Sequence, residues 1–276
     1  MDGTADSIVN ALLFAACGAL ATKFCYCAQE TTLGTPAADG EESRTVDLPD
    51  GSRGTIPSPS HVLALCKHRR SIFPKDYSKP RKDKVPRQVL DHMLEAANTA
   101  PTHGITEPWR FVVLEGGAMQ RLGELKLAHA KATARSAADY EKQLPKLLAK
   151  EKKTETCSAL IAVCMKRVTT EKGKLMPVWE EIASVASAVQ NMHLVLAAYG
   201  LGGYWSSGGC ADVDEGWGSS AAIKRMLGVD GEVQGESDRI LGIFYVGSPE
   251  PQRYEVLTSS RARKVGAWSD KVLYLE

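Results

Sequence analysis

The chain has 276 residues, of which 43% are hydrophobic and 24% are charged. This composition is typical of a globular protein with enough apolar residues for one substantial core. The formal net charge of +1 provides no long-range attraction to phosphate backbones or acidic lipids, so we expect no nucleic-acid partner.

An apolar segment opens the chain. Residues 7–22 are almost entirely apolar, and the run continues past Lys23 to Ala28. The extended run reaches the ~20 residues that span a bilayer, and a lysine near its end can snorkel to the interface. We therefore expect residues 1–28 to be a membrane anchor that leaves the catalytic domain in a reducing compartment; without an anchor, the protein would be cytoplasmic or organellar.

Two alternatives to the anchor stay open. A cleaved secretory signal would have a cleavage site at Ala19-Leu20-Ala21, but Asp2 and Asp6 precede the apolar run and no basic residue does. The segment can also be a helix packed on the folded domain. Residues 29–60 are rich in Gly, Pro, Ser, Thr and acidic residues, which predicts a flexible linker before a domain at residues 61–276.

Helices and strands alternate irregularly in the rest of the chain, which favours a layered α+β or α/β domain. The prolines Pro86 and Pro177 stand at predicted helix starts, and Gly200 and Gly228 at predicted helix ends. The predicted helices lie at residues 61–68, 86–97, 177–198 and 219–227, with one or two more within 118–153. The predicted strands lie at residues 110–114, 159–165 and 240–246.

The cysteines argue against a metal centre and against a disulfide framework. They are seven in number and scattered, and no pair has C-x-x-C spacing or a histidine at a matching distance. An odd, scattered set favours a reducing compartment. They are Cys17, Cys25, Cys27, Cys66, Cys157, Cys164 and Cys210.

Four sequence blocks, in this order, carry the functional signal. They are Arg69-Arg70-Ser71, residues 96–115 with the sequence AANTAPTHGITEPWRFVVLE, residues 200–208 with GLGGYWSSG, and residues 240–249 with ILGIFYVGSP. Together they resemble the flavin-binding signature of the nitroreductase family, nearest to its small single-domain subgroup. The resemblance implies an α+β fold with a central sheet flanked by helices, and an intertwined homodimer with two FMN sites in the subunit interface.

The resemblance also assigns roles to single residues. Arginine binds phosphate bidentately, and the Arg-Arg-Ser turn is where the family holds the phosphate of FMN. The Ala-Pro turn is expected beside the flavin ring, and Gly202-Gly203 is expected to be a turn that lets the backbone approach the cofactor. The cofactor-binding residues implied are Arg69, Arg70, Ser71, Thr99, His103, Trp205, Ser206 and Ser207. Arg261, Arg263 or Lys264 are candidates for a further phosphate contact.

The end of the long helix matches a segment implicated in contact with NADH or NADPH, although an ordinary core helix fits it equally well. Its residues are Val195, Leu196, Ala197, Ala198, Tyr199 and Gly200. The chain has no Gly-x-Gly-x-x-Gly fingerprint, which suits a dinucleotide that docks transiently over a flavin. Glu180 and Glu181 are expected to be helix-terminus charges rather than general acids.

The expected function is that of an FMN-dependent oxidoreductase. NADH or NADPH would pass hydride to N5 of FMN, and a small organic acceptor such as a nitroaromatic, quinone or enone would take the electrons. Three alternatives stay open: a halotyrosine deiodinase-like enzyme, suggested by the stretch Thr106-Glu107-Pro108-Trp109; oxidative flavin chemistry; and a catalytically silent flavin-binding module.

Overall fold

The computed structural model describes residues 44–48, 51–78, 84–210, 216–259, 267 and 269–275. The chain separates into two compact units, Met1–Ser60 and His61–Glu276. The predicted membrane anchor at residues 1–28 and the candidate phosphate ligands Arg261, Arg263 and Lys264 lie outside the described residues. No helix within the described ranges combines the length and apolar character needed to cross a membrane.

The first unit contains a β-hairpin within the segment predicted to be a flexible linker. Strands β1 (Arg44–Asp47) and β2 (Arg53–Ile56) pair antiparallel, with Arg44 opposite Ile56. Gly51 has a φ of 82° and donates its N–H to the Leu48 carbonyl at 2.9 Å. The predicted linker therefore contains a β-hairpin, in which Thr45, Val46 and Thr55 are residue types that favour strands.

A four-stranded antiparallel sheet forms the centre of the second unit. Its strand order is β3 (Trp109–Leu114), β4 (Ala159–Met165), β8 (Arg239–Gly247) and β5 (Gly202–Ser206). All seven residues of β4 are buried, as the continuous apolar run in the sequence predicts for a central strand. Strand β5 lies at one edge of the sheet.

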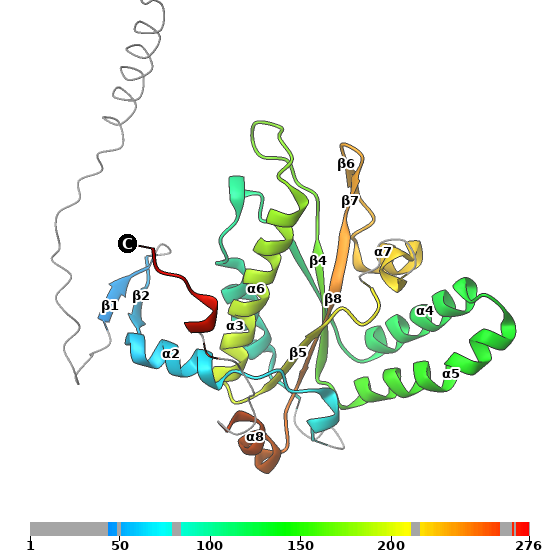
Figure 1. Ribbon diagram of the computed structural model, residues 1–276, viewed down its shortest axis with the longest axis horizontal. Coiled ribbons are helices and arrows are strands. Elements are labelled where there is room, and N and C mark those ends of the chain that lie inside the picture. The colour runs from blue at the N-terminus through cyan, green and yellow to red at the C-terminus, as the bar shows by residue number, and fades with distance from the viewer. Residues whose placement is uncertain are drawn as a thin grey trace, which may run out of the picture. The chain divides into compact units, whose positions relative to one another are not determined.

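Helices cover both faces of this sheet (Figure 1). Helices α3 (Arg87–Asn98) and α6 (Val178–Ala198) pack on one face, where Ile161, Val163 and Phe244 contribute to the core. Helices α4 (Gly117–Thr133), α5 (Ala137–Lys152) and α7 (Ala221–Leu227) lie on the other. There Leu160 and Ile243 face the second core cluster, as the period of two along a strand requires.

Short elements complete the unit. A helix, α2 (Pro59–His68), precedes the Arg-Arg-Ser turn, and α8 (Pro251–Thr258) follows β8. A hairpin of β6 (Glu232–Val233) and β7 (Glu236–Ser237) leads into β8. The 3₁₀ helices are η1 (Pro74–Asp76), η2 (His103–Ile105), η3 (Lys153–Thr156), η4 (Trp217–Ser219) and η6 (Ser269–Lys271).

The predicted helices and strands are present in this order, within a few residues of their predicted ends, and the α+β class is confirmed. Strand β5 and helix α8 are additions to the prediction. The Gly202-Gly203 pair is not a turn: both residues belong to β5 and pair with Gly247 and Val246 of β8.

Candidate functional site

The Arg69-Arg70-Ser71 turn is attached to edge strand β5. Ser71 forms a parallel bridge with Gly203, and the Ile72 N–H donates to the Gly203 carbonyl at 2.9 Å. The structure thus brings the first and third motif blocks together, although they are more than 100 residues apart in the sequence.

The buried Tyr77 stabilises the contact between this turn and β5. Its hydroxyl donates to the Ile72 carbonyl at 3.0 Å, and its ring is only 2% exposed. A Cβ on Gly202 would lie 2.5 Å from the ring, and one on Gly247 would lie 2.3 Å from it. The glycines of the motif therefore make room for a tyrosine side chain, rather than supplying a flexible turn.

His193 of α6 forms a hydrogen bond to the same turn. Its Nε2 lies 3.0 Å from the Arg70 carbonyl oxygen, which can only accept, so Nε2 carries the proton. Burial, with the nearby Arg69 charge adding to it, lowers the pKa of His193 to about 4. The imidazole is therefore neutral near pH 7. His193 is not evident as a site residue from the sequence, because it occurs within a long apolar helix pattern.

The two arginines have different environments. Arg70 Nη1 donates to the carbonyl of Lys67 and, at 3.0 Å, to its neighbour Arg69, so this group stabilises the negative end of α2. Arg69 continues the helix by donating its N–H to the Leu65 carbonyl at 2.9 Å. One guanidinium nitrogen of Arg70 is thus already committed to the main chain.

Trp205, Ser206 and Ser207 form the end of β5 and the residue after it. Trp205 packs against the α6-side core and Ser206 lines a cavity on the other face, as alternation along a strand requires. Gly242, with a φ of 136°, lies beside a bulge in β8, and a Cβ there would be 2.4 Å from the Ser206 carbonyl oxygen.

The indole of Trp205 supplies a donor suited to a ligand. Its Nε1 is buried and has no hydrogen-bond acceptor among the described residues. A buried N–H without a partner costs about 1–3 kcal/mol, so an acceptor supplied by a bound group would stabilise this position. The Arg-Arg-Ser turn, the edge of β5 and this donor together fit a phosphorylated, hydrogen-bonding cofactor.

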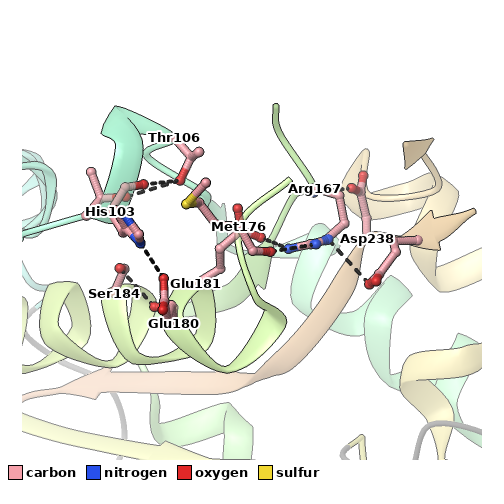
Figure 2. Close-up of polar contacts among 10 residues, drawn as sticks. His103, Thr106, Arg167, Met176, Glu180, Glu181, Ser184 and Asp238 are labelled. Atoms are coloured by element: carbon pink, nitrogen blue, oxygen red, sulfur yellow. Dashed lines mark hydrogen bonds and ion pairs between the residues drawn. The ribbon is translucent and has the colours of Figure 1, made fainter. Parts of the chain in front are cut away.

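Thr99 and His103 lie away from the Arg-Arg-Ser turn in the single chain. The Thr99 hydroxyl donates to the Ala96 carbonyl at 2.8 Å, at the end of α3. His103 Nδ1 donates to Glu180 Oε2 at 2.5 Å, at the start of α6 (Figure 2). Glu180 and His193 are thirteen positions apart on α6 (193 − 180). At 1.5 Å per residue that is about 20 Å, so His103 and the Arg-Arg-Ser turn contact α6 at well-separated points of the single chain.

The loop that carries His103 has a strained backbone. Ile105 and Glu107 have φ values of 54° and 42°, next to Gly104 at 66°, an angle that glycine adopts without strain. Such angles are rare for a β-branched residue, and Ile105 is also 83% exposed. Strained and exposed apolar residues of this kind cluster at binding sites.

A buried ion pair next to this loop was not predicted. Arg167, which follows β4, contacts the Glu181 carboxylate through Nη1 and donates through Nη2 to the Met176 carbonyl at 2.9 Å (Figure 2). Its backbone N–H donates to Asp238 Oδ1 at 2.8 Å. Burial raises the pKa of the Glu181 carboxyl, and the Arg167 guanidinium opposes that rise.

Glu180 and Glu181 both lie in the first turn of α6, as predicted. Glu181 is in addition the buried partner of Arg167, and Glu180 pairs with His103. The sequence contains no signal for the pair, because Arg167 and Glu181 are separated by a loop whose path is set by tertiary packing.

The dinucleotide segment is partly closed to ligands. Leu196 is fully buried and Ala197 is 7% exposed, so these two belong to the core. The exposed residues are Ala198, Tyr199 and Gly200, and the Tyr199 hydroxyl lies 2.6 Å from His92 Nδ1. Val195 is half-buried and packs against the core, so the exposed part of the candidate segment is its C-terminal end.

Comparisons with known proteins identify the family of the chain. The family model described as "Nitroreductase family" matches residues 66–248. The provisionally named NAD(P)H nitroreductase YdjA of Escherichia coli K12 is 27% identical over 163 residues, covering 59% of this chain and 77% of that protein. Its similarly named counterpart YfhC of Bacillus subtilis is 26% identical over 144 residues, covering 52% and 68%.

Solved structures share the fold. A nitroreductase-like protein from Bacillus cereus aligns with a TM-score of 0.56 at 20% identity, covering 78% of this chain and 96% of that one. A Bacteroides fragilis nitroreductase with bound FMN aligns with a TM-score of 0.51 at 20% identity, covering 78% and 98%. The family model spans the Arg-Arg-Ser turn, the Ala-Pro turn, β5 and β8. The chain therefore belongs to the nitroreductase family.

Proposed function

We propose that this protein is an NAD(P)H-dependent flavin oxidoreductase that uses FMN. The observation that carries the proposal is the family match over residues 66–248, within which the Arg-Arg-Ser turn is fixed on the edge of β5. YdjA and YfhC are named for NAD(P)H nitroreductase activity, and solved neighbours were crystallised with FMN or with NADPH. These names support the same chemistry for this chain.

Arg69 and Ser71 bind the phosphate of FMN in this proposal. Arg70 contributes positive charge to the phosphate site, and its Nη1 holds the end of α2. His193 and Tyr77 keep the turn rigid, so binding does not have to order it. Trp205, Ser206 and Ser207 supply donors along the cofactor. FMN itself would accept hydride at N5 and pass the electrons to the acceptor.

The second half of the site comes from another copy of the chain. His103 and the Arg-Arg-Ser turn contact α6 about 20 Å apart, and this separation favours an arrangement in which Thr99 and His103 serve the flavin bound by a second protomer. A homodimer also provides cover for the C-terminal apolar residues. Leu273, Tyr274 and Leu275 are 79%, 76% and 86% exposed in the single chain.

NADH or NADPH would contact the exposed end of α6, at Ala198, Tyr199 and Gly200. A nitroaromatic, quinone or enone would take its place once the oxidised dinucleotide has left. The protein residues orient the two reactants in turn, which is the contribution expected of a protein whose cofactor carries the chemistry.

Arg69→Ala tests the cofactor site. Losing one charge-assisted phosphate contact costs roughly 1.5–3 kcal/mol, so we expect FMN affinity to fall about ten- to over a hundredfold, with the fold retained. Equilibrium dialysis with FMN measures this, and Arg121→Ala is the matched control, because Arg121 is exposed and pairs with Glu124 at the surface of α4.

The activity itself is tested by anaerobic reduction. The wild-type protein loaded with FMN should lose its yellow colour on addition of NADH or NADPH and regain it on addition of an acceptor. A protein that takes up no FMN would refute the cofactor assignment, and a bound flavin that neither dinucleotide reduces would identify a silent module.

A further inference from the structure

A cavity of about 640 Å³ lies between the α4–α5 pair and strands β5 and β8. This volume is in the range of pockets that enclose a small organic ligand. The cavity lies on the sheet face opposite α6. It is therefore separate from His193, which contacts the Arg-Arg-Ser turn from α6. Ser206 of β5 lines it.

Four aromatic side chains form walls of the cavity: Phe73, Tyr204, Trp217 and Tyr245. The Phe73 and Tyr204 rings are 4.3 Å apart between centroids and tilted by 41°, whereas those of Tyr204 and Tyr245 are 5.9 Å apart and inclined by 22°. The near-parallel Tyr204 and Tyr245 rings present flat apolar surfaces, against which a planar ligand ring can stack.

A nearly buried lysine enters the same space. The Lys126 side chain, from α4, is 11% exposed and lines the cavity. Its Nζ lies 3.5 Å from Glu151 Oε1 and 5.0 Å from the centre of the Trp217 ring. Burial lowers the pKa of Lys126, while the Glu151 carboxylate raises it. At 3.5 Å the ion pair is long, so an additional anion near Nζ would further stabilise the ammonium.

The charges around the cavity also favour an anion. Its lining includes five lysine or arginine residues and two carboxylates. The cations are Lys75, Lys126, Arg135, Lys150 and Lys153, and the carboxylates are Asp139 and Glu151.

We propose that this cavity binds a planar aromatic anion, with a carboxylate or a similar acidic group at Lys126 and its ring against the aromatic walls. The inference goes beyond the proposed function, since binding requires neither the Arg-Arg-Ser turn nor any transfer of electrons. Because Ser206 lines the cavity, a ligand bound there would lie next to β5, the strand that the proposed cofactor also contacts.

The test compares two probes of nearly the same shape. Isothermal titration of the full-length, FMN-loaded, oxidised protein with 4-nitrobenzoate and with 4-nitrobenzamide measures the preference for the anion. We expect the carboxylate to bind more tightly, and Lys126→Met to reduce this preference by about tenfold or more. Lys126→Arg should retain the preference, because the charge is kept. Lys131→Met is the matched control, at an exposed position of the same helix, and should bind as the wild type does.

Equal affinities for the two probes in the wild type would overturn the proposal, as would a preference that Lys126→Met leaves unchanged or no binding of either probe. If Lys126→Met does not fold, a Lys126→Arg protein that loses the preference would overturn it equally. The heat of binding is measured on oxidised protein without a dinucleotide, so failure of flavin reduction leaves this test intact.

Discussion

At the scale of single residues, the Arg-Arg-Ser turn depends on a histidine of α6 that lies outside the four motif blocks. His193 is 6% exposed and donates to the carbonyl of Arg70, and only its neutral form suits this buried position. The loop near the other end of α6 relies in the same way on His103 and Glu180. Both flavin-related turns are therefore anchored by imidazole contacts that involve the same helix.

His193 predicts a pH dependence of stability. Its pKa is about 4 when folded, against 6.5 for an ordinary histidine. Between these values the unfolded chain binds a proton that the folded chain does not, so stability falls on acidification through this window, by up to about 1.4 kcal/mol per pH unit. Above pH 7 the contribution is constant. The free energy of unfolding, measured with urea at pH 5, 6 and 7, should change less with pH in His193→Gln than in the wild type.

His61→Gln, at an exposed position, is the control for that experiment and should keep the wild-type slope. A slope that is the same in all three proteins would show that protonation of His193 is not linked to folding.

At the scale of elements, β5 is a strand made possible by glycine. Its first two residues leave room for Tyr77 on one face and for Phe244 and Leu196 on the other. A Cβ at Gly203 would lie 2.6 Å from Phe244 Cζ and 2.7 Å from Leu196 Cδ2. Glycine disfavours strands by itself, so pairing with β8 and these contacts determine the conformation here.

Two glycine-to-alanine substitutions should have opposite effects. Gly203→Ala overpacks the core and should destabilise the protein by about 1–3 kcal/mol. Gly117→Ala places a methyl group in open space at the start of α4 and should be neutral or stabilising by up to about 1 kcal/mol. Chemical denaturation measures both, and equal stabilities would contradict the packing described for β5.

At the scale of the whole molecule, the Arg167–Glu181 pair joins the exit of β4 to the first turn of α6, and Asp238 ties the same exit to the start of β8. Both side chains of the pair are nearly fully buried, at 1% and 2% exposure. Removing one partner from such a pair leaves an uncompensated buried charge, whereas removing both does not.

Arg167→Met should therefore destabilise the protein by roughly 3–5 kcal/mol, and the double variant Arg167→Met, Glu181→Leu should recover much of the loss. A double-mutant cycle of unfolding free energies measures this coupling. Additive losses in the double variant would mean that the two charges do not compensate each other.

The sequence by itself determined the family, the order of the main helices and strands, and the Arg-Arg-Ser and Ala-Pro turns. These features follow from local patterns: helix periodicity, the apolar runs of β4 and β8, and prolines and glycines at element ends. Strand β5 was not predicted from the sequence. Two consecutive glycines are more typical of a turn than of a strand, and the residues that pack against them in space are not visible in the sequence.

Only the tertiary structure decided which residues meet. It placed the Arg-Arg-Ser turn on Gly203, put His193 beneath Arg70, left Thr99 and His103 elsewhere in the same chain, and paired Arg167 with Glu181. The cavity around Lys126 likewise combines residues from α4, α5, β5, β8 and the Trp217 turn. The physical reason is common to all of them. Contacts between distant segments are selected by packing and by the cost of burying unpartnered polar groups, and neither is encoded in a local pattern.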